Sequence, residues 1–182
     1  MRSLLLLFLA LAASHAQSLP NTEGDFIARD FTFHTGEKLA ELRLHYTTLG
    51  APARDAAGHV RNAVIIMHGT GGTGRGFLGA GFAGELFGKD QPLDIARYFI
   101  VLPDAIGHGG SSKPSDGLHM KFPHYDNEDM VRADYRLLTE GLGVDHLRLV
   151  MGTSMGAMNS WIWGYLCLDF MDALMPLASV GF

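Results

Sequence analysis

The stretch LVMGTSMGAM, residues 149–158, places a serine between two glycines where an apolar run gives way to a helical pattern. Gly152, Ser154 and Gly156 fit G-x-S-x-G in the strand-turn-helix context of a nucleophile elbow. A serine on so sharp a turn has a strained backbone, and the positions two before and two after it must be nearly free of side chain for strand and helix to approach. The pattern therefore predicts an exposed Ser154 hydroxyl at a helix N-terminus.

A helix N-terminus favours developing negative charge, so the backbone N–H of Met155 is a candidate donor to an oxyanion on a substrate bound at Ser154. A bare G-x-S-x-G also arises by chance in a Gly-rich chain, where it is a simple tight turn. The elbow needs a second donor from the loop after the third strand. HGTGG, residues 68–72, follows such an apolar run, and its Thr70 N–H is the candidate.

The same loop has another interpretation, because GTGGTG from Gly69 to Gly74 fits the dinucleotide fingerprint G-x-G-x-x-G. That fingerprint predicts an acidic residue about 20 residues further on, at the end of the next strand. Asp104 lies 30 residues after Gly74 and belongs to its own Gly-rich turn, which it is expected to fix. The glycines are better explained as a loop that lets the backbone approach a substrate on Ser154.

The pattern along the chain predicts an α/β fold with about six strands in a mostly parallel sheet and helices on both faces. The expected strands are residues 26–34, 39–50, 63–67, 98–104, 147–152 and the start of 173–179, the first two forming an antiparallel hairpin. Asp126 is a candidate N-cap for a helix over 126–143, whose apolar face holds Met130, Ala133, Leu137 and Leu138. The helix over 154–168 is largely apolar and is expected to be buried, with Trp161, Trp163 and Tyr165 in its packing. A wall of the substrate site is the alternative role for one of these aromatic side chains.

Three motifs in this order resemble the α/β-hydrolase fold superfamily: HG after one strand, PDAIGHGGSSKP after the next and GTSMG after the following one. Residues 42–179 resemble its homoserine O-acetyltransferase-like branch. The resemblance implies that Ser154 is the nucleophile, that Met155 and Thr70 are the oxyanion donors, and that His68 orients the loop. The chain departs from the acetyltransferases at Asn159, where they usually have Gln, and at DAIGHGGS, which is closer to plain hydrolases.

In this fold the catalytic triad runs Ser, then Asp or Glu, then His. The only acids after Ser154 are Asp169 and Asp172, and the last histidine, His146, precedes the serine. A serine without a base to take its proton is a weak nucleophile near neutral pH. We therefore expect the acid and base beyond Phe182, so that residues 17–182 are one α/β-hydrolase domain incomplete at its C-terminus and a poor catalyst alone.

The first residues, MRSLLLLFLALAASHAQS, have the anatomy of a secretory signal peptide, with Arg2, a short apolar run and small residues near Ala16. We expect residues 1–16 to be cleaved, the mature protein to be secreted or periplasmic, and no membrane span to remain.

The formal charge of −5 comes without a Lys/Arg block, which excludes the usual footprint of a nucleic-acid binder. With one cysteine and scattered histidines, no metal site or cofactor is expected, and the predicted partner is a small acyl substrate.

Three functions remain open on the sequence alone. The first is a secreted, esterase-like serine hydrolase working through an acyl-Ser154 intermediate. The second is an acyltransferase that passes the same acyl group to an alcohol such as homoserine. The third is a non-catalytic remnant or binding protein that keeps the fold without the triad. Because acetyl-coenzyme A is a cytoplasmic donor, the signal sequence favours the hydrolase.

Overall fold

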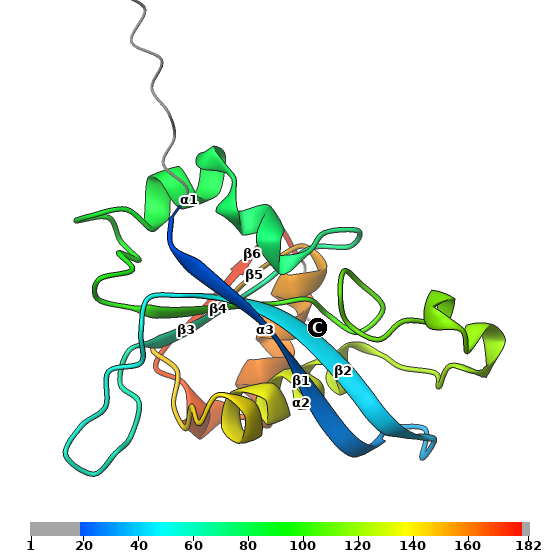
Figure 1. Cartoon of the computed structure of the whole chain (residues 1–182). Coiled ribbons are helices and arrows are strands. Elements are labelled where there is room, and N and C mark those ends of the chain that lie inside the picture. Colours follow the sequence, from blue (N-terminus) through cyan, green and yellow to red (C-terminus); the bar gives the residue numbers. More distant parts are fainter. Residues whose placement is uncertain (1–18, 180–182) are drawn as a thin grey trace, which may run out of the picture.

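A computed structural model describes residues 19–179, so the predicted signal peptide over residues 1–16 lies outside the described residues. The chain forms a six-stranded sheet in the order β1-β2-β4-β3-β5-β6 (Figure 1). The strands are β1 (Asn21–Thr32), β2 (Lys38–Leu49), β3 (Ala63–Met67), β4 (Phe99–Pro103), β5 (Leu149–Thr153) and β6 (Leu174–Leu177). β3 to β6 are mutually parallel, whereas β1 and β2 pair antiparallel and β2 joins β4 antiparallel. The predicted mixed, mostly parallel sheet is confirmed.

Helices cover both faces of the sheet, as predicted. α1 (Ala80–Leu86) lies on one face, and α2 (Asn127–Arg136) and α3 (Met155–Leu166) lie on the other. Shorter turns of helix are η1 (Gly74–Leu78), η2 (Pro114–Asp116), η3 (His119–Lys121), the π-turn η4 (Leu137–Gly141) that continues α2, and η5 (Leu168–Phe170). The Gly-rich segment over 76–96 is divided between η1, α1 and irregular turns.

The continuous apolar run of β3 is explained by burial on both faces, because successive strand residues point to opposite sides. Ile65 packs in the cluster that contains Trp163 of α3 and Val131 of α2. Its neighbours Val64 and Ile66 pack in the cluster that contains Phe77 of η1 and Ala83 of α1. β3 therefore contributes to the hydrophobic core on both faces of the sheet. The loop after it begins at the end of a fully buried strand.

The start of α2 follows the sequence signal closely. Asp126 is the N-cap: its side chain accepts the N–H of Asp129, 3.1 Å away, and the Asp129 carboxylate accepts the N–H of Asp126 in return. This reciprocal capping box satisfies two of the N–H groups that a helix start leaves unpaired. The predicted apolar face is buried, with Met130 6% exposed and Ala133, Leu137 and Leu138 fully buried.

The expectation that the largely apolar α3 is buried is wrong for part of the helix. Trp163 is fully buried, but Trp161 is 42% exposed and Tyr165 is 82% exposed. Because this helix is apolar around most of its circumference, the sequence pattern does not show which side packs on the sheet. Only the Trp163 face packs on the sheet within residues 19–179.

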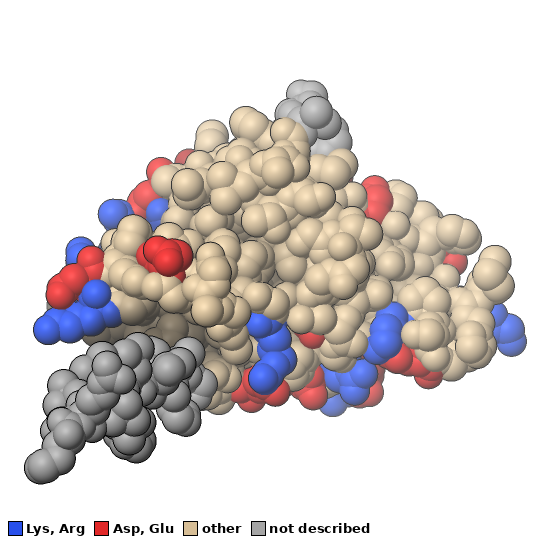
Figure 2. All heavy atoms as spheres, turned by 90° about the horizontal axis from the view of Figure 1, so that it is seen from above, with Lys and Arg blue, Asp and Glu red and all other residues tan. Residues whose placement is uncertain are grey.

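Charged side chains are dispersed over the surface. On the face shown in Figure 2, Lys and Arg lie mostly near the rim with Asp and Glu nearby, and uncharged side chains fill the middle.

Among residues 19–179, none of the helices has the length and apolar character that crossing a bilayer requires.

Candidate active site

Ser154 occupies the strained turn between β5 and α3. Its backbone has φ 52° and ψ −114°, in the positive-φ range that non-glycine residues rarely adopt. The Ser154 N–H donates to the carbonyl of Leu177 at 2.9 Å, and its carbonyl accepts the N–H groups of Ala157 and Met158. The turn is therefore fixed from β6 on one side and from the first turn of α3 on the other.

The two glycines of the motif are required by backbone contact. A Cβ on Gly152 would overlap the carbonyl oxygen of Gly156 and lie 2.8 Å from the nitrogen of Ala157. A Cβ on Gly156 would overlap the carbonyl oxygen of Met67 and lie 2.9 Å from that of His68. Because these neighbours are main chain, no side-chain rotation relieves the overlap. The glycines let α3 approach both β5 and the end of β3.

The Ser154 hydroxyl is available for chemistry. The residue is exposed, and within residues 19–179 its Oγ makes no hydrogen bond. The N–H of Met155, the first residue of α3, likewise has no acceptor in this part of the chain. A nucleophile and a first oxyanion donor require an exposed hydroxyl and a helix-start N–H without an acceptor, and among the described residues Ser154 and Met155 have these properties. Their catalytic roles stay predictions.

The loop after β3 packs directly against Ser154. A Cβ on Gly69 would lie 3.2 Å from Ser154 Cβ, a tight contact, and 3.8 Å from its Oγ, so a larger residue there would crowd the serine. The Gly72 N–H donates to the Gly69 carbonyl at 3.0 Å, closing a turn in which Gly71 has φ 75°. Thr70 lies at the tip of this turn, exposed, and its N–H has no acceptor among the described residues.

His68 anchors the start of this loop. It is 4% exposed, and its Nε2 accepts the N–H of Ala105 at 3.0 Å, which places the ring proton on Nδ1 for donation to the Gly69 carbonyl at 2.8 Å. Burial lowers the pKa of the imidazole, favouring this neutral form. Because both ring nitrogens are engaged, His68 holds the loop and has no free nitrogen for a proton from Ser154.

Asp104 connects the loop after β4 to the same region. It is 4% exposed, its Oδ2 accepts the N–H of Gly110 at 2.7 Å, and its carbonyl accepts the Ser111 hydroxyl at 2.6 Å. The expectation that Asp104 fixes the GHGGS turn is confirmed. Its Oδ1 also accepts the N–H of Gly74 at 2.7 Å, a bond across 30 residues that no local sequence signal predicts.

Residues 62–174 match the family model described as alpha/beta hydrolase fold, over more than half of the chain. The chain belongs to the α/β-hydrolase fold family.

Relatives place it in the homoserine O-acetyltransferase-like branch of that family. It is 35% identical over 162 residues to a homoserine O-acetyltransferase of Moorella thermoacetica, covering 81% of this chain and 42% of that protein. It is 32% identical over 155 residues to a probable acyltransferase of Methanothermobacter thermautotrophicus, covering 85% and 47%. An acetylester hydrolase structure from Corynebacterium glutamicum superposes with a TM-score of 0.76 at 26% identity, covering 87% and 44%. The chain spans about half the length of the curated relatives that it matches.

Among the described residues, a histidine-carboxylate pair at the amino ends of β5 and β6 lies away from Ser154. His146 Nε2 lies 2.8 Å from Asp172 Oδ1, and burial of neither group is complete. Both residues precede their strands, whereas Ser154 follows β5 at its carboxyl end. Since parallel strands keep their carboxyl ends together, this pair belongs to the opposite edge of the sheet and serves neither as base nor as acid for Ser154.

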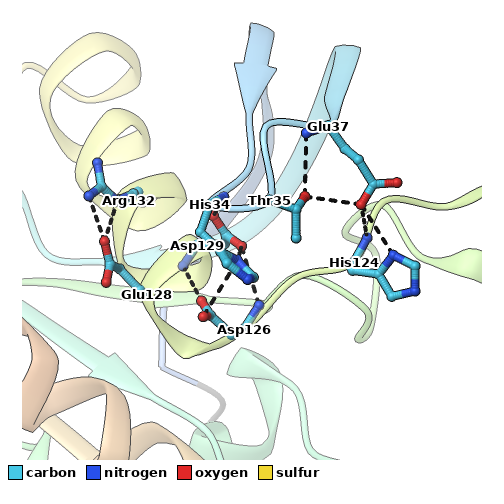
Figure 3. Close-up of polar contacts among 8 residues, drawn as sticks. All are labelled: His34, Thr35, Glu37, His124, Asp126, Glu128, Asp129 and Arg132. Atoms are coloured by element: carbon cyan, nitrogen blue, oxygen red, sulfur yellow. Dashed lines mark hydrogen bonds and ion pairs between the residues drawn. The ribbon is translucent and has the colours of Figure 1, made fainter.

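A second polar cluster, which sequence reasoning missed, joins the β1–β2 turn to the start of α2 (Figure 3). His34, Asp126 and Asp129 bring one nitrogen and two carboxylates within 4.8 Å of one another. The buried Asp129 carboxylate accepts the His34 N–H at 2.8 Å and its Nδ1–H at 2.6 Å, and this contact raises the pKa of His34. The three groups could in principle hold a metal ion. Their mutual hydrogen bonds and the capping box already account for the arrangement.

Proposed function

We propose that the protein is a secreted, esterase-like serine hydrolase that works through an acyl-Ser154 intermediate. The observation that carries the proposal is the exposed Ser154 hydroxyl on a strained turn that packs against Gly69. Two nearby segments, the start of α3 and the turn after β3, each offer an N–H group, those of Met155 and Thr70, that has no acceptor among residues 19–179. In the proposed reaction, Ser154 Oγ loses its proton to a general base as it bonds to the substrate carbonyl carbon. The carbonyl oxygen becomes an oxyanion that accepts hydrogen bonds from the backbone N–H groups of Met155 and Thr70.

Collapse of this intermediate breaks the bond to the leaving alcohol, which takes up the proton, and leaves the acyl group on Ser154. Water then attacks the acyl carbon and releases the acid and the free serine. The family order places the acid and base after the nucleophile, and no histidine follows Ser154 in this sequence. We therefore expect slow turnover by residues 17–182 alone, faster with added imidazole as an external base.

Acyl transfer to an alcohol is the second candidate, because the curated relatives include homoserine O-acetyltransferases. The structural neighbour from Corynebacterium glutamicum, named an acetylester hydrolase, supports the hydrolase instead. Both routes share the acyl-serine and differ only in the second acceptor.

A partition experiment separates the two routes. The protein is incubated with p-nitrophenyl acetate and imidazole, with and without homoserine, and the products are quantified by mass spectrometry. We expect acetate as the main product, unchanged by homoserine, and at least a tenfold lower rate above background for Ser154→Ala. O-acetylhomoserine as the main product would support the transferase, and equal rates for the two proteins would support a non-catalytic role.

We further propose that the protein is exported, on the basis of the signal-like residues 1–16. Expressed in a bacterial host, the mature protein is expected in the periplasm or medium with Gln17 as its first residue. Leu7→Arg, which interrupts the apolar run, should leave the unprocessed chain in the cytoplasm. N-terminal sequencing of each fraction measures this, and an intact Met1 on exported protein would contradict cleavage after Ala16.

A further inference from the structure

The loop that carries Thr70 is held at both of its ends by two consecutive residues at the end of β4. At its start, His68 Nε2 accepts the N–H of Ala105 at 3.0 Å. At its end, the N–H of Gly74 donates to Asp104 Oδ1 at 2.7 Å. The two bonds lie on either side of the Gly69–Gly72 turn that carries Thr70.

We propose that Asp104 is a positioning residue for the oxyanion hole, acting through the Gly74 N–H rather than on the substrate. The inference rests on the proposed function, because it assigns Thr70 as an oxyanion donor. Preorganised donors are effective because they need no reorganisation as charge develops. An anchor that fixes the end of a glycine-rich loop supplies such preorganisation.

The two backbone donors at this position favour a carboxylate over an amide. Its two oxygens each accept a backbone N–H, from Gly74 and from Gly110, both at 2.7 Å. Asparagine has only one oxygen and would point its own N–H₂ at one of the two donors. The neighbouring backbone is close as well, since a Cβ on Gly109 would overlap Asp104 Oδ2. A charged acceptor with two backbone donors forms stronger bonds than a neutral one.

Asp104 is unsuited to the role of triad acid for the same reason. Both oxygens are engaged by main-chain donors, and the residue is only 4% exposed. A triad acid instead accepts a hydrogen bond from the catalytic histidine. The carboxylate is therefore committed to joining the two loops.

Asp94 provides a matched control. It is 5% exposed, and its two oxygens also accept two backbone N–H groups, from Ala96 and Asp90, both at 2.8 Å. It lies before β4, at the strand end opposite to Asp104. Asp94→Ala and Asp104→Ala therefore make the same chemical change at similar burial, one away from the Thr70 loop and one beside it.

The test measures loop order and reactivity separately in the full chain. Amide hydrogen exchange by NMR should be at least tenfold faster at Gly74 in Asp104→Ala than in the unmodified protein, and unchanged there in Asp94→Ala. With a fluorophosphonate probe and added imidazole, the maximal labelling rate of Ser154 should fall at least tenfold in Asp104→Ala. The probe concentration for half-maximal rate should change less than twofold. Asp104→Asn, which keeps one acceptor, should be intermediate and serves if the alanine variant does not fold.

Unchanged Gly74 exchange or an unchanged labelling rate in Asp104→Ala would overturn the proposal, as would an equal loss of labelling rate in Asp94→Ala. In Asp104→Asn, a lower labelling rate without faster exchange at Gly74 would overturn it too. If the unmodified protein forms no Ser154 adduct, the proposed function fails. The exchange at Gly74 still decides whether Asp104 holds the loop.

Discussion

Gly156→Ala is expected to destabilise the protein by about 3 kcal/mol or more, because the added Cβ would overlap main chain on a neighbouring strand. The carbonyl oxygen of Met67 occupies that position, and the His68 carbonyl lies 2.9 Å from it. Helix α3 would have to move away from β3, and Ser154 would move with it. Urea unfolding of the two proteins measures the difference.

Gly84→Ala is the control, because Gly84 lies within α1 and a Cβ there meets no atom within 4 Å. Alanine is the better helix former, so this variant should gain roughly 0.5–1 kcal/mol. We therefore expect the free energy of unfolding to fall in Gly156→Ala and to rise in Gly84→Ala. Equal stability of Gly156→Ala and the unmodified protein would show that close packing of the elbow is not required.

Replacement of Asp134 by asparagine is expected to stabilise the protein increasingly as pH rises. Asp134 lies on α2, is 3% exposed, and makes no side-chain hydrogen bond or ion pair with residues 19–179. Val131 and Leu138, one helical turn away on either side, belong to the apolar cluster around Trp163. Burial raises the pKa of the Asp134 carboxyl group from 3.8 to about 8.

The direction follows from proton linkage. Between pH 4 and pH 8 the folded protein holds a proton on Asp134 that the unfolded chain has released, so stability falls as pH rises through this window. At pH 7 the loss relative to pH 4 is on the order of 4 kcal/mol. An asparagine side chain at this position cannot titrate, so the free energy of unfolding of Asp134→Asn should lack this decline.

Asp129→Asn gives the contrast on the same helix. Asp129 is also buried, but its carboxylate accepts N–H groups of His34 and Asp126, so its replacement should destabilise the protein at neutral pH. Urea unfolding at several pH values compares the three proteins. If stability declines with pH equally in Asp134→Asn and in the unmodified protein, the decline does not come from the buried carboxyl group of Asp134, and the prediction is wrong.

Local signals in the sequence predict the elements well. The alternation over residues 26–34 and 39–50 indicates the hairpin, and the Asp126 cap indicates where α2 begins. The G-x-S-x-G pattern is local too, since its glycines and serine define one turn. The fold family follows from such motifs in order, and the match over residues 62–174 confirms it.

Contacts between segments that are distant in the sequence could not be predicted from local patterns. The bond from Gly74 to Asp104 depends on β3 and β4 lying side by side, which periodicity alone does not specify. The His34 cluster depends in the same way on where the β1–β2 turn meets α2. The burial of Asp134 could have been suspected, because it lies four residues from both Met130 and Leu138 on the apolar face.

The most direct test of the account is to map where a fluorophosphonate reacts. The unmodified protein is treated with the probe and imidazole at pH 8, digested, and analysed by tandem mass spectrometry, with Ser154→Ala and Ser160→Ala in parallel. Ser160 is a buried serine of the same helix whose hydroxyl donates to the Gly156 carbonyl. We predict one adduct, on Ser154, retained in Ser160→Ala and lost in Ser154→Ala. An adduct on another residue, or labelling that persists in Ser154→Ala, would contradict the assignment of Ser154 as the nucleophile.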